Sequence, residues 1–160
     1  MNGMTFWSTL LLSLAPISEL RGAIPWAFYR GVPLCYAALL GYAGNLLVGP
    51  IAFTFLASLH TLLYRHLSWY VKLFDYFVVR TRKKVARAVE RFGIWGIMLF
   101  VAIPLPFTGA WTGTLAAWIF GLDKKRSLLA VFGGVTIAAL IVTSVIYLGF
   151  SDHSIFVKHF

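Results

Sequence analysis

The feature that most constrains this chain is an acid and a base between two prolines, inside an otherwise apolar run. Glu19 and Arg21 lie between Pro16 and Pro25, and residues 4–15 before them carry no charge. Either this stretch is a surface loop with solvated charges, or it is a break in a membrane helix. A charge at membrane depth costs about 3 kcal/mol and is retained for function. The apolar surroundings favour the second explanation, with the charges as a working site.

The composition places the whole chain in a membrane. Of its 160 residues, 60% are hydrophobic and only 12% are charged, whereas soluble domains carry about 25% charged residues. We therefore predict one integral membrane domain, residues 1–160, with a few spans of about 20 residues each. The net charge of +9 is also typical of nucleic-acid binding, but the basic residues cluster beside apolar segments. We predict no nucleic-acid partner.

The first segment is too short to span a bilayer. Residues 4–15 reach about 18 Å at 1.5 Å per residue, or roughly half of a hydrocarbon core about 30 Å thick. A second short arm, 22–29, follows the charged stretch. Two half-length arms around a proline break predict a re-entrant helical hairpin over residues 4–30.

The next two segments predict a transmembrane helix and a surface helix. Residues 34–63 contain no Asp, Glu, Lys or Arg and are long enough to span with tilt; Pro50 predicts a kink. For Asn45, near mid-depth, we favour an interhelical hydrogen bond, and substrate contact stays open. Residues 67–92 alternate apolar and basic side chains at helical spacing, which is typical of an amphipathic helix on anionic lipids.

The second half of the chain repeats the plan of the first. In residues 93–122 an apolar arm leads to Pro104 and Pro106, and a second arm rich in Thr and Gly follows. Residues 127–150 form another uncharged segment, which predicts a second transmembrane helix.

The basic residues decide the predicted topology. Eight Lys and Arg residues lie between 65 and 91, and three more occupy 124–126. If 93–122 crossed the membrane once, these clusters would lie on opposite sides, against the positive-inside rule. A re-entrant 93–122 places residues 65–92 and 123–126 in the cytoplasm and both termini outside. The predicted fold class is an all-α integral membrane protein, an inverted repeat of re-entrant hairpin plus transmembrane helix. An amphipathic interfacial helix joins the repeats, and such a plan is typical of transporters.

Two motifs carry a resemblance to a known family. ELRGAIP at 19–25 and IPLPFTGAWTG at 103–113 resemble the bacterial family named putative small multidrug export proteins, a compact relative of the DedA/VTT membrane proteins. The resemblance implies two opposed re-entrant hairpins and movement of phospholipids or of the undecaprenyl phosphate carrier. DedA proteins have arginines around the second hairpin, but this chain has no charge between Arg91 and Asp123. A DedA scheme of proton coupling is therefore not carried over.

The two breaks offer complementary chemistry. Arg21 can bind an anionic group through its fork of donors, while Glu19 either positions Arg21 or exchanges a proton. We expect Thr108 to cap the following helix, whose first backbone N–H groups can bind phosphate; tight packing of small residues is an equal explanation. The predicted substrate-binding residues are Ser18, Glu19, Arg21, Asn45, Thr108, Gly109, Trp111 and Thr112. The predicted structural breaks are Pro16, Pro25, Pro104 and Pro106.

The leading hypothesis is a transporter of an anionic lipid carrier, a polyprenyl phosphate such as undecaprenyl phosphate, bound between Arg21 and the 108–112 backbone. The alternative is a proton-coupled exporter of lipophilic cations that uses Glu19, and a non-transporting membrane scaffold is a third class. No catalytic constellation or metal site is evident, so we predict no enzyme and no cofactor, apart from possible coupling to H⁺ or Na⁺. Re-entrant hairpins need lateral cover, which predicts a homodimer or larger oligomer in the bacterial inner (cytoplasmic) membrane.

Overall fold

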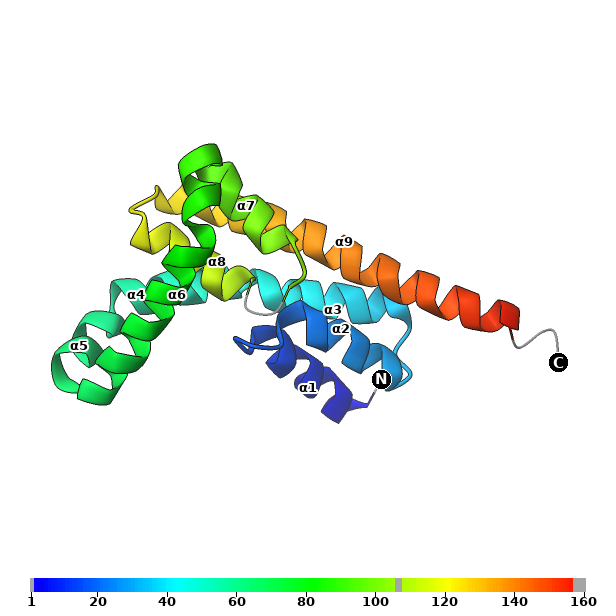
Figure 1. Ribbon diagram of the computed structural model, residues 1–160. Helices are drawn as coiled ribbons and strands as arrows, with labels where there is room; N and C mark the ends of the chain where they lie inside the picture. The colour runs from blue at the N-terminus through cyan, green and yellow to red at the C-terminus, as the bar shows by residue number, and fades with distance from the viewer. Residues whose placement is uncertain (1, 106–107, 157–160) are drawn as a thin grey trace.

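The computed structural model describes residues 2–105 and 108–156, and every regular element in these ranges is an α-helix (Figure 1). The all-helical prediction is confirmed. The helices are α1 (Gly3–Leu14), α2 (Glu19–Tyr29), α3 (Leu34–Leu46), α4 (Val48–Ala57), α5 (Leu59–His66), α6 (Ser68–Phe92), α7 (Ile94–Ala102), α8 (Ala110–Ile119) and α9 (Lys124–Phe156).

Two helical segments of the described chain are long and apolar enough to cross a membrane. They are Leu34–Ala57, made of α3 and α4, and Lys124–Gly149 within α9. The first is interrupted at Leu47, one turn before Pro50. Pro50 has no N–H to donate to the preceding turn, so the interruption falls just before the predicted kink. Residues 59–63, expected as the end of that helix, belong to the separate helix α5 (Leu59–His66).

Two helical hairpins pack on these segments. The α1–α2 hairpin contacts α3, and the α7–α8 hairpin contacts α9. In Figure 1 the hairpins lie toward opposite ends of the molecule, and the turn within each lies near its middle. Ala15 and Ile103 are both extended, with ψ of 134° and 118°. Because the residue before a proline is pushed out of the helical region, Pro16 and Pro104 explain where α1 and α7 end.

The other two predicted proline breaks have different outcomes. Pro25 lies inside α2, which continues to Tyr29, so the prediction of a break there is wrong. The proline removes one backbone hydrogen bond, but Leu20, Ile24 and Ala27, on either side of it, are fully buried and hold the helix together. Pro106 lies outside the described residues.

Both hairpins end in the same backbone motif. The Val32 N–H donates to the Ala27 carbonyl (3.1 Å), and the Leu122 N–H donates to the Ala117 carbonyl (3.0 Å). The intervening residues are Gly31 and Gly121, with φ of +82° and +64°. This is a Schellman cap, which glycine favours because it adopts positive φ without strain.

The same residue offset that relates these two caps also relates other features of the two halves. The number of residues between Gly31 and Gly121 also separates Leu34, the first residue of α3, from Lys124, the first residue of α9. It also separates Gly44, which lies against Ser13 of α1, from Gly134, which lies against α7. In each half, therefore, the long helix packs on the first arm of its own hairpin through an equivalent glycine.

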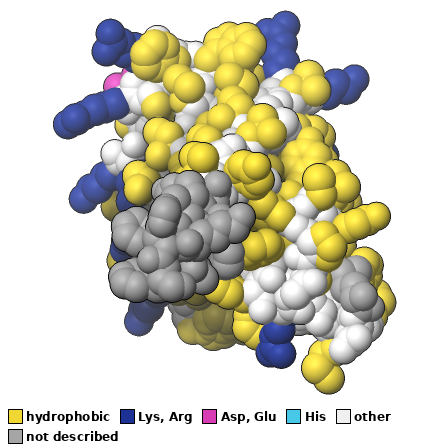
Figure 2. All heavy atoms as spheres, turned by 90° about the vertical axis from the view of Figure 1, so that its right-hand side faces the viewer, with side chains coloured by type: hydrophobic (Ala, Val, Ile, Leu, Met, Phe, Trp, Pro, Cys, Tyr) yellow, Lys and Arg dark blue, Asp and Glu magenta, His cyan; other side chains and the backbone are white. Residues whose placement is uncertain are grey.

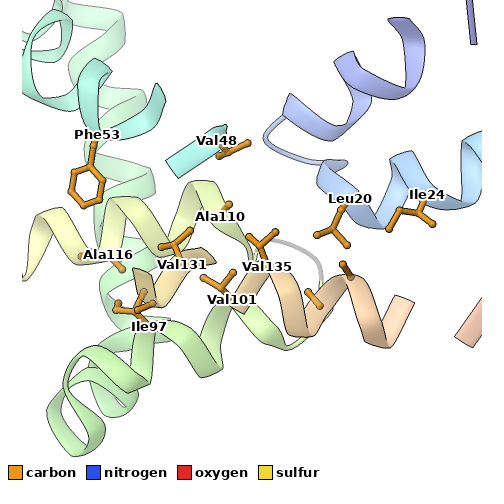
Figure 3. Packing of buried hydrophobic residues seen from close by; sticks show 14 of the residues in the cluster. Leu20, Ile24, Val48, Phe53, Ile97, Val101, Ala110, Ala116, Val131 and Val135 are labelled. Atoms are coloured by element: carbon orange, nitrogen blue, oxygen red, sulfur yellow. The ribbon is translucent and has the colours of Figure 1, made fainter. Parts of the chain in front are cut away.

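One continuous apolar core joins the two halves. Figure 3 shows its side chains converging from α2, α4, α7, α8 and α9. The outer surface is also apolar, and hydrophobic side chains cover most of the face in Figure 2, with Lys and Arg around its edge. Leu140 and Val145 of α9 are each 64% exposed. Such surfaces suit a lipid environment, because exposed apolar patches of this extent are rare on soluble proteins.

The contact of α9 with α7 gives a first prediction. A Cβ at position 134 would lie 2.7 Å from the Met98 carbonyl oxygen and 2.6 Å from the Val101 Cβ. Gly134→Ala should therefore force the helices apart and cost about 2 kcal/mol. We expect the unfolding midpoint in mild detergent to fall by about 5 °C.

Gly149→Ala is the matched control, because a Cβ there meets nothing within 4 Å. It should leave the midpoint unchanged or raise it slightly, since alanine favours the helix. Equal shifts for the two variants would contradict close packing at Gly134.

Candidate functional site at the meeting of the two breaks

Glu19 lies buried at the start of α8. It is 4% exposed, and its two carboxylate oxygens accept hydrogen bonds from the backbone N–H groups of Ala110 (3.3 Å) and Trp111 (3.2 Å). The first N–H groups of a helix have no partner within the helix and carry partial positive charge. The carboxylate of Glu19 therefore occupies an anion site built by α8.

Gly109 makes this approach possible. A Cβ at position 109 would lie 1.9 Å from the Glu19 Oε2 atom, so any side chain there would displace the carboxylate. Glu19 itself has a φ of +49°, a conformation that costs an L-residue about 1–2 kcal/mol. Such strain persists where surrounding contacts impose it and is concentrated at functional sites.

Arg21 binds the other side of the second break. Its Nη2 donates to the carbonyl oxygens of Ile103 (3.2 Å) and Val101 (3.4 Å). Its Nη1 donates to the Leu105 carbonyl and to the Thr108 hydroxyl. These carbonyls lie at and just after the end of α7, where the helix no longer supplies donors. The guanidinium therefore acts as a cap for α7, and within the described residues its buried Nε has no partner.

The end of α1 is capped in return from outside its own hairpin. The Asn45 Nδ2 donates to the Ser13 carbonyl (2.9 Å), and the Trp111 Nε1 donates to the Leu14 carbonyl (2.8 Å). We call these contacts, together with those of Glu19 and Arg21, the interbreak clasp. It pairs backbone groups at all three helix ends that meet at the centre of the molecule.

Two threonines hydrogen bond to backbone groups within the second break. Thr108, expected as the N-cap of α8, is not the cap. Its hydroxyl bonds the Ile103 and Leu105 carbonyls at 2.7 and 2.8 Å. The N-cap is Gly109, whose N–H donates to the Thr112 hydroxyl (2.9 Å). The cap moves by one residue because Glu19 needs a position without a side chain next to the helix start.

The structure thus brings together most of the predicted substrate-binding residues. Ser18 lies apart from the clasp and packs against Gly22 of its own hairpin. Glu19 and Arg21 make their hydrogen bonds to the second break rather than to each other. The sequence interpretation missed the carbonyl acceptors at residues 101–105. The signal was present, since a helix that ends before Pro104 must leave carbonyls that need external donors.

A second polar cluster lies outside the apolar segments. His60 of α5 hydrogen bonds the Tyr70 hydroxyl through Nδ1 (3.1 Å) and lies 4.1 Å from the Phe74 ring, between centroids. Burial lowers the pKa of His60, and the negative charge of Asp75 opposes that shift. The charge of Asp75 also raises the pKa of Tyr64, whose hydroxyl donates to it (3.3 Å). This cluster ties α5 to α6.

The fold and the clasp define a class of small, all-helical membrane proteins with a polar centre between helix breaks. Residues 19–141 match the model of the family described as "Putative small multi-drug export protein", and the chain belongs to that family. This confirms the resemblance carried by the two motifs. The match begins at Glu19. It covers all of the apolar segment Leu34–Ala57 and the segment Lys124–Gly149 as far as Ile141. The family is one of export proteins rather than of enzymes. No curated protein and no solved structure matches the chain closely enough to compare.

The clasp gives a second prediction. Glu19→Gln removes the charge from two hydrogen bonds, and Gly109→Ala displaces the carboxylate. Each should lower the free energy of unfolding by about 2 kcal/mol. Because both act on the same contact, the double variant should cost at least about 1 kcal/mol less than the sum. Denaturation in mixed micelles measures all three variants.

Glu90→Gln is the control, since Glu90 is exposed on α6. It should change stability little, with or without Gly109→Ala. Full additivity of Glu19→Gln and Gly109→Ala would show that the carboxylate and Gly109 act independently and would contradict the clasp.

Proposed function

We propose that this protein is a membrane exporter that works by alternating access, with the interbreak clasp as its central gate. In this proposal α1–α2 and α7–α8 are re-entrant hairpins that enter from opposite faces and meet near the midplane. Their equivalent caps at Gly31 and Gly121, and the equivalent glycines at 44 and 134, support an inverted repeat. Opposed repeats around a central site are the usual basis of alternating access.

One observation carries the proposal for the cargo: the protein's own carboxylate fills a helix N-terminus at the centre of the molecule. Such a terminus binds phosphate as readily as carboxylate. An anionic cargo can therefore replace Glu19 at α8 while Arg21 leaves the α7 carbonyls to bind the same anion. The exchange opens the clasp, because Glu19 and Arg21 then no longer link the two breaks.

The cargo that fits best is a lipid with a single phosphate, such as undecaprenyl phosphate. One guanidinium fork and one helix N-terminus together match one phosphate group. The exposed apolar sides of α3 and α9 allow a polyprenyl tail to stay in the bilayer while the head group reaches the breaks.

The exposed residues at the two turns bear on whether the protein forms an oligomer. Ile17 and Leu105 at the two turns are 81% and 56% exposed, and broken backbone in a membrane needs protein or water beside it. We include a homodimer or larger oligomer in the proposal, with the basic residues 65–92 and 123–126 on the cytoplasmic side.

The third prediction tests the cargo. In proteoliposomes the wild type should move undecaprenyl phosphate across the bilayer, and Arg21→Gln should lower the rate at least about tenfold, since a charge-assisted fork contributes about 1.5–3 kcal/mol. Arg21→Lys should fall between them, because one ammonium cannot replace the fork.

Arg30→Gln is the matched control, because Arg30 is exposed and stacks on Trp26 (4.5 Å) away from the clasp. It should transport at the wild-type rate. Full transport by a folded Arg21→Gln protein would end the lipid-phosphate proposal.

A second candidate is a proton-coupled exporter of lipophilic cations, which the family description favours. Glu19 is the buried carboxylate that such a mechanism requires. Protonation would remove the negative charge with which Glu19 accepts hydrogen bonds from α8. Loss of the proton would restore a carboxylate that can pair with a cation.

The fourth prediction separates the two candidates. With tetraphenylphosphonium as the probe and an imposed pH gradient, a cation exporter should lose efflux entirely in Glu19→Gln, with no effect of added lipid phosphate. The anionic-lipid transporter should show no gradient-driven efflux of this probe, either in the wild type or in Glu19→Gln. Efflux by the wild type that Glu19→Gln abolishes would favour the cation exporter.

A further inference from the structure

A cavity of about 260 Å³ lies between α6 and α8, which pack against each other (Figure 1). We propose that this α6–α8 cavity binds a phosphate group, as the station at which the lipid-phosphate cargo waits before it enters the clasp. The role as a station rests on the proposed function, whereas phosphate binding does not. The lining residues are Tyr76, Phe77, Arg80, Thr81, Lys84 and Thr112. The volume is below that of pockets for drug-sized ligands and suits a small charged head group.

The α6 side of the cavity carries two cations beside apolar side chains. Tyr76, Arg80 and Lys84 follow one another at intervals of four residues, so they share one face of α6. The Arg80 Nη1 donates to the Tyr76 hydroxyl (2.8 Å), which orients the guanidinium. An oriented arginine and a nearby lysine are the usual pair of phosphate ligands, one as a fork and the other as a point charge.

The surroundings add positive charge and hydroxyl groups. A neighbouring groove shares Tyr76, Arg80 and Lys84 and adds Lys72 and Lys83, with Asp75 as its one acidic member. On the inner side the cavity is lined by Thr81, which is 3% exposed, and by Thr112 of α8. Basic side chains and hydroxyls on the surface helix therefore converge on one concave site.

Thr112 connects the cavity to the clasp. Its hydroxyl accepts the Gly109 N–H (2.9 Å), and Gly109 lies directly against the Glu19 carboxylate. The first turn of α8 thus borders the cavity through Thr112 and holds Glu19 at the N–H groups of Ala110 and Trp111.

The test compares two paired variants of α6 that remove the same charge. Arg80→Gln/Lys84→Gln removes both cations from the cavity, and Arg87→Gln/Arg91→Gln removes two cations of the same helix that do not line it. Native mass spectrometry of the full chain in detergent measures binding of dioctanoyl phosphatidic acid, dioctanoyl phosphatidylcholine and inorganic phosphate.

We expect phosphatidic acid to bind the wild type, and the cavity pair to weaken binding at least about tenfold, since each basic side chain near an anionic lipid contributes about 1 kcal/mol. The control pair should bind as the wild type does. The exchanged pair Arg80→Lys/Lys84→Arg should retain most of the binding. Binding of inorganic phosphate with the same dependence on the cavity pair would assign the site to free phosphate, and preference for phosphatidic acid assigns it to a lipid.

Equal losses in the two paired variants would overturn the proposal, because diffuse surface charge would then explain the binding. Binding of phosphatidylcholine as tight as that of phosphatidic acid, or no binding of either phosphate probe, would also overturn it. Failure of lipid transport with intact, cavity-dependent binding would reject the proposed function and leave the phosphate site standing. An unchanged melting midpoint in the cavity pair verifies that loss of binding is not loss of fold.

Discussion

The backbone groups at three broken helix ends are the constraint on which this structure depends. α1 ends at Leu14 and α7 at Ala102, each leaving carbonyls without donors, and α8 begins at Ala110 with N–H groups without acceptors. Each such group left unpaired away from water costs several kcal/mol. The second break therefore needs a donor at its first end and an acceptor at its second. An arginine and a glutamate two residues apart supply both, which explains why an acid and a base persist inside an apolar run.

How far the sequence predicts this arrangement depends on how local each cause is. The ends of α1 and α7 follow from Pro16 and Pro104, because a proline restricts its immediate neighbour. Pro25 has the same local chemistry, yet α2 continues through it, since burial of the surrounding apolar residues outweighs one lost hydrogen bond. The family is likewise evident from its two motifs.

The site was predictable in its members but not in its pairing. Glu19, Arg21 and Trp111 stand out as polar groups near the breaks, and Asn45 stands out as an amide inside an apolar helix. Their partners are backbone atoms distant along the chain, from the Ser13 carbonyl for Asn45 (32 apart) to the Leu14 carbonyl for Trp111 (97 apart). Every residue type has the same backbone carbonyl, so a sequence motif does not indicate which carbonyls act as acceptors. The positive φ of Glu19 was also unpredictable, because local preference opposes it and only the tertiary contacts with α8 impose it.

The chemistry of the clasp discriminates between the two candidate cargoes. A bound phosphate pairs with Arg21 and with the N–H groups of α8. Glu19 and the α7 carbonyls then lose the partners that they have in the clasp. A proton on Glu19 removes that charge and creates one hydroxyl donor. The Ile103 and Leu105 carbonyls keep the bonds that they accept from the Leu105 and Thr108 N–H groups, so the new donor is needed by the Val101 carbonyl alone among the three that Arg21 caps. A bound cation instead pairs with Glu19 and leaves the N–H groups of α8 without an acceptor, while Arg21 stays on the α7 carbonyls with no anion to balance its charge. Arginine does not lose its proton in proteins, so no proton transfer relieves that side. An opened clasp can therefore be fully paired around a lipid phosphate, whereas around a lipophilic cation it retains an uncompensated positive charge.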